Sequence, residues 1–211
     1  MDLLYSAKLQ TPAYVFSENE LMENLALAKR IADENDIHLL YTLKPLDYAS
    51  VMKKMVGIVE GFAASSVFEA RLARDILGDA GSIHYVTPGL RDSELDELTQ
   101  LCQHITVNSA AQWHRMAPLL KGKVKLGVRI NPRLSVVDDE RYDPCSEDSR
   151  LGLQIPEFLF HIKKYPELLD SISGIHMHTN CEGEDFKDLR STVEKISKGL
   201  GHYLDQLEWF N

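Results

Sequence analysis

The sequence predicts an α/β fold, namely a parallel (β/α)8 barrel of the TIM type that stops before its last strand. Three observations predict it. Short apolar and β-branched runs alternate with amphipathic helical patterns along the 211 residues. One helix separates successive runs, which implies parallel pairing with right-handed crossovers. The final run, Leu207 to Asn211, reads as a buried strand just begun, whereas such a barrel closes with eight strands in roughly 250 residues.

The first predicted element is a strand at 11–16 (TPAYVF), which begins beside a proline. Ser17 follows it as a helix N-cap, and Glu20 completes a capping box three residues later. The helix that starts there places four apolar residues on one face: Leu21, Leu25, Ala28 and Ile31.

The barrel units are expected to occupy 37–211. Strands are predicted at 37–42, 58–63, 83–86, 105–107, 124–130, 172–178 and 207–211. Helical patterns lie between them at about 46–56, 66–77, 92–102, 109–120, 156–164 and 185–200. The irregular segment 131–149 is rich in acidic residues. A loop of this length in a compact domain is usually functional or else partly disordered, and the sequence leaves both open.

Composition excludes several classes of partner. The formal net charge of −9 argues against nucleic acid, because binding phosphates requires a basic surface. No stretch approaches the roughly 18 consecutive apolar residues of a membrane span, and the N-terminus lacks the features of a secretory signal. Cys102, Cys145 and Cys181 have no metal-like spacing. They fit reduced thiols, so we expect a cytoplasmic protein without a membrane partner.

Lys44 is the first candidate for chemistry. It lies where the apolar run 37–43 ends, and Pro45 cannot donate a hydrogen bond to continue the pairing. Side chains at the carboxyl ends of barrel strands line the active site, and a lysine there can form a Schiff base with an aldehyde cofactor. An exposed lysine at a strand end is the structural alternative.

Two histidines form the second candidate. His176 and His178 are two residues apart on a predicted strand, so they share one face. A flat imidazole at a strand end can lie against an aromatic cofactor ring. An H-x-H pair can also bind a metal, as in metal-dependent hydrolases, although no further cluster of potential ligands is apparent. A histidine pair without a ligand is the third reading.

Arg129 is the third candidate, because an isolated charge inside the apolar run 124–130 would be costly to bury. It can face the barrel mouth and hold an anionic group, or it can form a structural salt bridge across the barrel. Ser66 and Glu69 also follow a strand, but a capping box explains them structurally.

Five motifs together carry a family resemblance. They are YTLKPL, GFAASSVFEARLA, RINP, RYDPCSEDSRLGL and GIHMHTNCE, and they occur in this order. In this combination the chain resembles the carboxynorspermidine (carboxyspermidine) decarboxylases. These belong to the fold III pyridoxal-phosphate enzymes, which include alanine racemase, ornithine decarboxylase and diaminopimelate decarboxylase. The likeness extends from TPAYVF to LEWFN.

The resemblance implies roles for five residues. Lys44 matches the catalytic lysine that holds pyridoxal 5'-phosphate, and His178 matches the histidine stacked on its ring. Cys181 lies where relatives place a serine near the phosphate, and Arg129 matches a barrel arginine close to the cofactor. Arg150 matches a basic residue found at the ring hydroxyl in some relatives and at the dimer interface in others.

The implied activity is decarboxylation of carboxynorspermidine or carboxyspermidine to norspermidine or spermidine, by a homodimer and without a metal. In relatives the strand at 11–16 joins a C-terminal β domain, and a glycine-rich phosphate loop follows the LEWFN strand. Since neither part is present, we expect this chain alone to be inactive. The alternatives are another fold III decarboxylase of the diaminopimelate or ornithine type, and a non-catalytic cofactor-binding or regulatory remnant.

Overall fold

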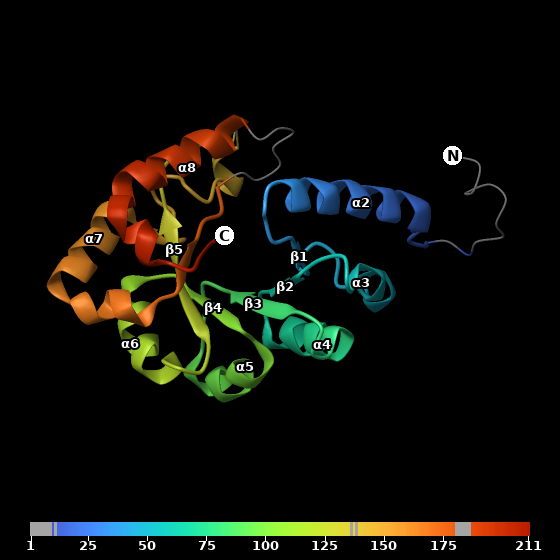
Figure 1. Ribbon diagram of the computed structural model, residues 1–211, viewed down its shortest axis with the longest axis horizontal. Coiled ribbons are helices and arrows are strands. Elements are labelled where there is room, and N and C mark those ends of the chain that lie inside the picture. Colours follow the sequence, from blue (N-terminus) through green and yellow to red (C-terminus); the bar gives the residue numbers. More distant parts are fainter. Residues whose placement is uncertain (1–9, 11, 136, 138, 180–186) are drawn as a thin grey trace.

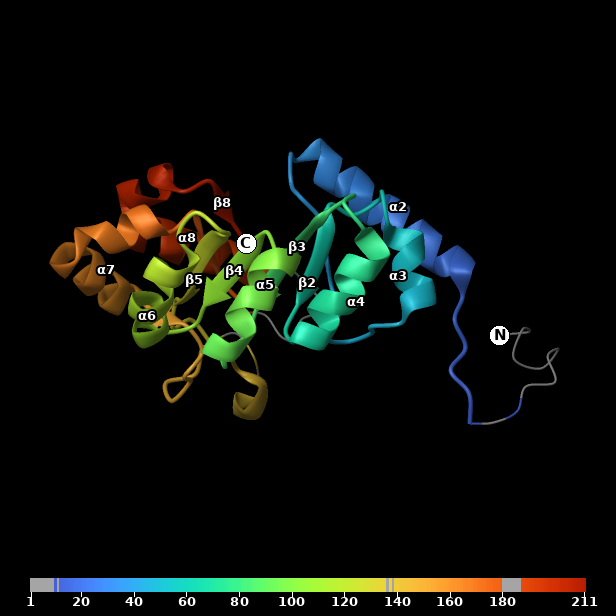
Figure 2. The ribbon, with the colours of Figure 1, turned by 90° about the horizontal axis from the view of Figure 1, so that it is seen from below.

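The computed structural model describes residues 10, 12–135, 137, 139–179 and 187–211. Its strands form one curved parallel sheet, and the helices from α3 to α8 surround its outer face (Figures 1 and 2). Along the sheet the strands are β1 (Leu40–Thr42), β2 (Gly61–Ala64), β3 (Ser82–Val86), β4 (His104–Val107), β5 (Lys125–Asn131), β7 (Gly174–His176) and β8 (Trp209–Phe210). The short β6 (Leu153–Gln154) pairs with the end of β5.

The helix α2 precedes β1, and the later helices connect successive strands, as the sequence predicts. They are α2 (Glu18–Glu34), α3 (Ala49–Met55), α4 (Val67–Leu77), α5 (Leu95–Leu101), α6 (Ala110–Leu120), α7 (Ile155–Lys164) and α8 (Lys187–Leu200). Short 3-10 segments are η1 (Asp92–Glu94), η2 (Glu140–Tyr142), η3 (Pro166–Ser171) and η4 (Gly201–Gln206). Within the described ranges, no helix is both long and apolar enough to cross a membrane.

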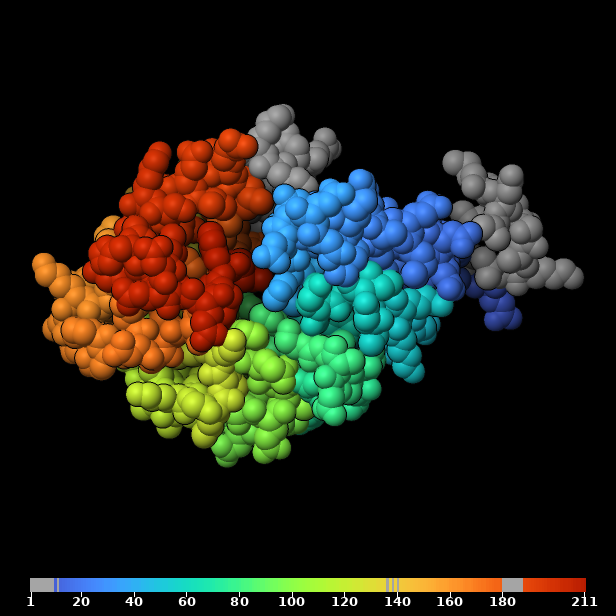
Figure 3. Space-filling view, in the orientation of Figure 1, coloured from blue at the N-terminus to red at the C-terminus, as the bar shows by residue number. Residues whose placement is uncertain are grey.

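The sheet is an open half-barrel, which confirms the predicted fold class. β1 pairs only with β2, and β8 only with β7, among the described residues. The two edges nevertheless lie close to one another. Residues 36–38 before β1 and residues 208–211 around β8 line a common cavity. In the space-filling view the red C-terminal segment lies next to the end of the blue α2 (Figure 3).

Strand alternation divides the sheet into an apolar and a polar face. Phe62, Ile83, Ile105 and Ile175 are each fully buried and belong to the core beneath the helices. Their neighbours along the strands face the inside of the half-barrel, and register places them side by side. The inner face includes Thr42 beside Ala63, His84 beside both Ala63 and His104, and Arg129 beside His176. The polar inner face is therefore where ligand chemistry is possible.

Side-chain caps fix the starts of three helices. Ser17 Oγ accepts a hydrogen bond from the Glu20 N–H at 3.4 Å, which confirms the predicted N-cap of α2. At α4, Ser66 Oγ accepts from the Glu69 N–H, and Glu69 Oε2 accepts from the Ser65 N–H at 2.6 Å. The arrangement differs from the predicted capping box by one residue, because Glu69 accepts from the residue before the N-cap and not from Ser66 itself. Ser109 caps α6 in the same way.

The strand predicted at 11–16 is not formed among the residues that the structure describes. Residues 12–16 have no regular structure, and Tyr14, Val15 and Phe16 are exposed. Their β-branched and aromatic character is typical of a strand, but no described strand runs beside them to share hydrogen bonds. An unpaired strand gains too little to remain ordered in water.

Trp113 joins three outer elements. Its ring stacks on Phe158 of α7 with centroids 5.2 Å apart, and its Nε1 donates to Ser171 Oγ in η3 at 3.1 Å. Both rings are almost completely buried. We expect Phe158→Ala to lower the free energy of unfolding by about 3–4 kcal/mol, because it removes a buried aromatic side chain and leaves a cavity. Urea denaturation measures this loss.

Phe160→Ala is the matched control, because Phe160 lies on the same helix and is 56% exposed. Its loss should remain below about 1 kcal/mol. Equal losses in the two variants would contradict the packing described for Trp113 and Phe158.

Candidate active site

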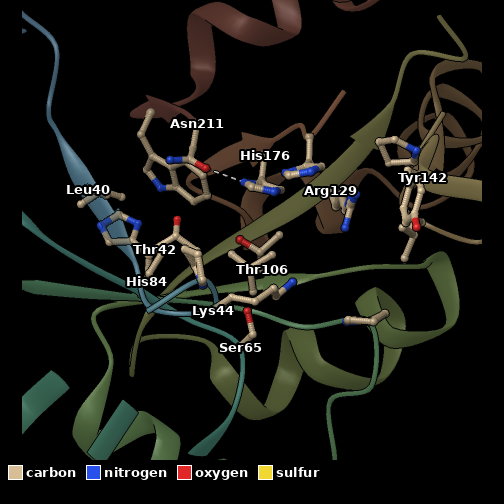
Figure 4. A pocket seen from close by; sticks show the side chains of 18 of the residues that line it. Leu40, Thr42, Lys44, Ser65, His84, Thr106, Arg129, Tyr142, His176 and Asn211 are labelled. Atoms are coloured by element: carbon tan, nitrogen blue, oxygen red, sulfur yellow. Dashed lines mark hydrogen bonds between the residues drawn. The ribbon is translucent and has the colours of Figure 1, made fainter. Parts of the chain in front are cut away.

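A cavity of about 630 Å³ opens at the carboxyl ends of the strands (Figure 4). This volume is in the range of pockets that bind small molecules or cofactors. Lys44 follows β1, Ser65 follows β2, Arg129 belongs to β5, and His178 follows β7 by two residues. Residues far apart in the sequence thus share one wall because parallel strands all end at the same edge.

The strand β1 positions Lys44 through its neighbours. Leu43 is buried, and its N–H donates to the Ala63 carbonyl at 3.0 Å, which extends the pairing of β1 with β2 by one residue. A turn follows, in which the Leu46 N–H donates to the Leu43 carbonyl. Because Leu43 points into the core, Lys44 points to the opposite face. Its side chain extends into the cavity between Thr106 and Ser65 (Figure 4).

Arg129 lines the same cavity and is 9% exposed. It lies opposite His176 in the register of β5 and β7. Arg129 thus lies at the barrel mouth, and its role in holding an anionic group stays a prediction. A guanidinium held there by a central strand provides a permanent positive charge close to Lys44 and His178.

Burial favours the neutral form of His178. It lowers the pKa of the imidazole, and the positive charges of Arg129 and Lys44 lower this pKa further. These electrostatic effects also show that the three predicted residues Lys44, Arg129 and His178 are close together. A neutral imidazole presents a flat face to a ligand without adding another positive charge.

His176 has a different environment. Burial lowers the pKa of its imidazole to about 4, although a hydrogen bond from Nδ1 to Asn211 Oδ1 partly opposes the shift. Across the described ranges, no three histidine, cysteine or acidic side chains form a group that could hold a metal ion. The described residues around His176 and His178 therefore give no support to the hypothesis of a metal-dependent hydrolase.

The structure does not bring Arg150, another predicted residue, into the site. The Arg150 side chain is exposed and does not line the cavity, while its carbonyl accepts a hydrogen bond from Asn108 Nδ2 at 3.0 Å. Its role stays a prediction. Cys181 lies outside the described residues.

Below Lys44, aromatic rings occupy the inside of the half-barrel. His84 and His104 stack with centroids 3.9 Å apart, and the Trp209 indole meets His104 edge to face. The indole fits because two neighbouring strands carry glycine there. A Cβ on Gly127 or Gly174 would lie 2.2 or 2.1 Å from indole carbons.

Several residues on the cavity wall were not identified from the sequence. His84 and Thr106 could have been found, because they alternate with buried apolar residues on β3 and β4 and must therefore face inward. Tyr142 and Asp143 also line the wall, but they belong to the irregular segment 131–149. A segment without periodicity gives no signal for the direction of a side chain.

Comparison with known proteins extends these observations. Residues 19–204 match the family model described as pyridoxal-dependent decarboxylase, pyridoxal binding domain. The chain is 35% identical over 206 residues to a carboxyaminopropylagmatine decarboxylase of Synechocystis sp., covering 97% of this chain and 51% of that protein. It is 29% identical to a carboxynorspermidine/carboxyspermidine decarboxylase of Campylobacter jejuni, covering 99% of this chain and 52% of that protein.

Solved structures agree with the sequence relatives. A crystal structure of carboxynorspermidine decarboxylase from Campylobacter jejuni, complexed with norspermidine, superposes with a TM-score of 0.82 at 28% identity. The match covers 96% of this chain and 50% of that one. A diaminopimelate decarboxylase from Helicobacter pylori has a TM-score of 0.81 at 17% identity, which shows a common fold. The chain spans about half the length of the curated relatives it matches.

The buried histidines predict how stability depends on pH. Burial is the main cause that lowers the pKa of His84 to about 3 and those of His104 and His176 to about 4, from an ordinary value of 6.5. Between these values the unfolded chain binds more protons than the folded chain, so stability rises with pH in this range. We expect the free energy of unfolding to fall by at least about 1 kcal/mol from pH 7 to pH 4.5.

Urea denaturation at several pH values measures this dependence. His84→Phe, which keeps a flat ring, should reduce it. His202→Asn should leave it unchanged, because His202 is exposed. The same pH dependence in the wild type and in His84→Phe would show that His84 is not a source of the effect.

Proposed function

The chain belongs to the pyridoxal-dependent decarboxylases, and from this membership we propose that it supplies the cofactor-binding part of an enzyme that decarboxylates a carboxylated polyamine. The substrate is carboxynorspermidine or carboxyspermidine, and the product is norspermidine or spermidine. One observation carries the proposal: Lys44, Arg129 and His178 line a single cavity in a chain whose relatives act on such compounds.

The residues on the wall fit pyridoxal 5'-phosphate, the cofactor of the family. An aldehyde requires an amine, and Lys44 is the one lysine among the described lining residues. A pyridine ring requires a flat neighbour, which the neutral imidazole of His178 can provide. Anionic oxygens require a cation, and Arg129 offers a guanidinium fork. The cavity volume of about 630 Å³ also suits a ligand of this size.

When bound, the cofactor supplies the sink for the electrons released with carbon dioxide. Lys44 Nζ binds the aldehyde, and its place after β1 keeps this amine facing the other groups. Arg129 orients an anionic oxygen through a charge that a central strand holds in place. His178 restrains the ring by contact, and its lowered pKa keeps a third positive charge out of the site.

A second substrate is favoured by one comparison. The relative with 35% identity is a carboxyaminopropylagmatine decarboxylase. Agmatine ends in a guanidinium, whereas norspermidine and spermidine end in amines. Both substrate types are therefore extended polycations with a carboxylated end, and the same cavity suits either.

Further features belong to the same proposal. We infer that 37–211 form the barrel units, that the segment 11–16 pairs with a β domain in a longer protein, and that this protein is a cytoplasmic homodimer. Cys181 near the phosphate and Arg150 at the ring hydroxyl or the dimer interface follow from the resemblance. Light scattering of the longer protein tests the dimer.

Covalent trapping tests the role of Lys44. Incubation with pyridoxal 5'-phosphate followed by borohydride should label Lys44, as peptide mapping by mass spectrometry would show. Lys44→Ala should abolish the label, because no other lysine lines the cavity among the described residues. Lys53→Ala is the control, since Lys53 is exposed on α3 and should not affect labelling. Label on other lysines alone would contradict this role.

A decarboxylation assay tests the activity. Carbon dioxide release is measured with carboxynorspermidine, carboxyspermidine and carboxyaminopropylagmatine, using residues 1–211 alone and the longer protein that carries them. Turnover by the longer protein and none by 1–211 is the expected result. Absence of turnover with all three compounds in the longer protein would overturn the proposed function.

A further inference from the structure

The rim of the cavity includes a carboxylate, Asp143, which belongs to the motif RYDPCSEDSRLGL but to which the resemblance assigns no role. Asp143 follows η2 in the irregular segment 131–149 and lines the cavity together with Tyr142. Hydrogen bonds fix the surrounding backbone, because the Pro144 carbonyl accepts from Asn131 Nδ2 at 3.2 Å and from Ser149 Oγ at 2.6 Å. Asn131 is itself the last residue of β5 and is 2% exposed. The sheet therefore holds this part of the loop in place.

The Asp143 side chain is almost completely buried, and one of its two oxygens is hydrogen-bonded to a described residue. It is 7% exposed, and Oδ1 accepts a hydrogen bond from the Cys145 N–H at 2.7 Å. Oδ2 makes no hydrogen bond and no ion pair with any described residue, and this atom is not sealed from solvent. A carboxylate with so little contact with water is costly unless a cation compensates its charge.

None of the described cations on the cavity wall forms an ion pair with the Asp143 carboxylate. Arg141 is committed elsewhere, because its guanidinium donates to both oxygens of Asp139, at 2.9 Å to Oδ1 and 2.6 Å to Oδ2. Neither Lys44 nor Arg129 forms an ion pair with Asp143 within 4 Å. Among the described lining residues, Asp143 is the one acidic side chain. Within the described part of the wall, Asp143 is thus the single anionic point.

We propose that Asp143 binds an ammonium group of the polycationic substrate and so acts as a specificity-determining residue of the site. This inference rests on the proposed function, because it assumes that the ligand is a carboxylated polyamine. The reacting end of such a molecule lies toward Lys44 and Arg129. A second ammonium group can then donate to Asp143 Oδ2 in a charge-assisted hydrogen bond, while Oδ1 remains bound to the Cys145 N–H.

Polyamine binding tests this assignment. Norspermidine is titrated into the longer protein loaded with pyridoxal 5'-phosphate, and the Kd is measured by calorimetry. Asp143→Asn keeps an acceptor for the Cys145 N–H but removes the charge, so we expect the Kd to rise about tenfold. Asp143→Glu, which restores the charge, should recover part of the affinity. Borohydride labelling of Lys44 should be equal in all variants, which shows that the cofactor site is intact.

Asp148→Asn is the matched control, since it removes one carboxylate from the same segment but Asp148 is exposed and does not line the cavity. Its Kd should equal that of the wild type. The inference is overturned if Asp143→Asn binds norspermidine as the wild type does, if both variants weaken binding equally, or if the wild type does not bind it. Failure of the proposed function is a separate result, namely absence of carbon dioxide release from the wild type.

Discussion

Side chains that alternate between the two faces of a parallel sheet create the core and the cavity together. Phe62, Ile83 and Ile105 lie under the outer helices, and the residues next to them in each strand face inward. A slip of one residue in the register of β5 would bury Arg129 under the helices and expose Val128 to the cavity. The fold therefore tolerates charged groups inside the half-barrel because the other face alone makes the core.

This constraint explains how much of the molecule can be predicted from the sequence. Most strands and helices follow from periodicity, because the central strands carry a buried face against the helices. The short β6 was not predicted, and Phe210 of β8, which was expected to be buried, is 42% exposed. Lys44, Arg129 and His178 were identified for the same reason, as polar residues at or near the ends of apolar runs. The directions of Arg150 and Asp143 could not be predicted, since turns without a repeat orient them. Gly152, two residues after Arg150, has a φ of 85° and lies in such a turn.

The segment 11–16 shows the converse limit. Its composition is typical of a strand, but a strand is stable only when a neighbour shares its hydrogen bonds, and none of the described strands lies beside it. The residue types of a segment thus show that it can form a strand, whereas pairing with a neighbouring strand decides whether it does. The chain spans about half the length of the curated relatives it matches.

The chain contains two tryptophans, and the fold gives them opposite surroundings. Trp113 is sealed beneath α7, whereas Trp209 lies over Gly127 and Gly174 and lines the cavity below Lys44. Indole emission responds to nearby dipoles and to energy transfer toward absorbing ligands. The molecule consequently carries its own optical probe: Trp209 senses what enters the half-barrel, and Trp113 provides a constant internal reference.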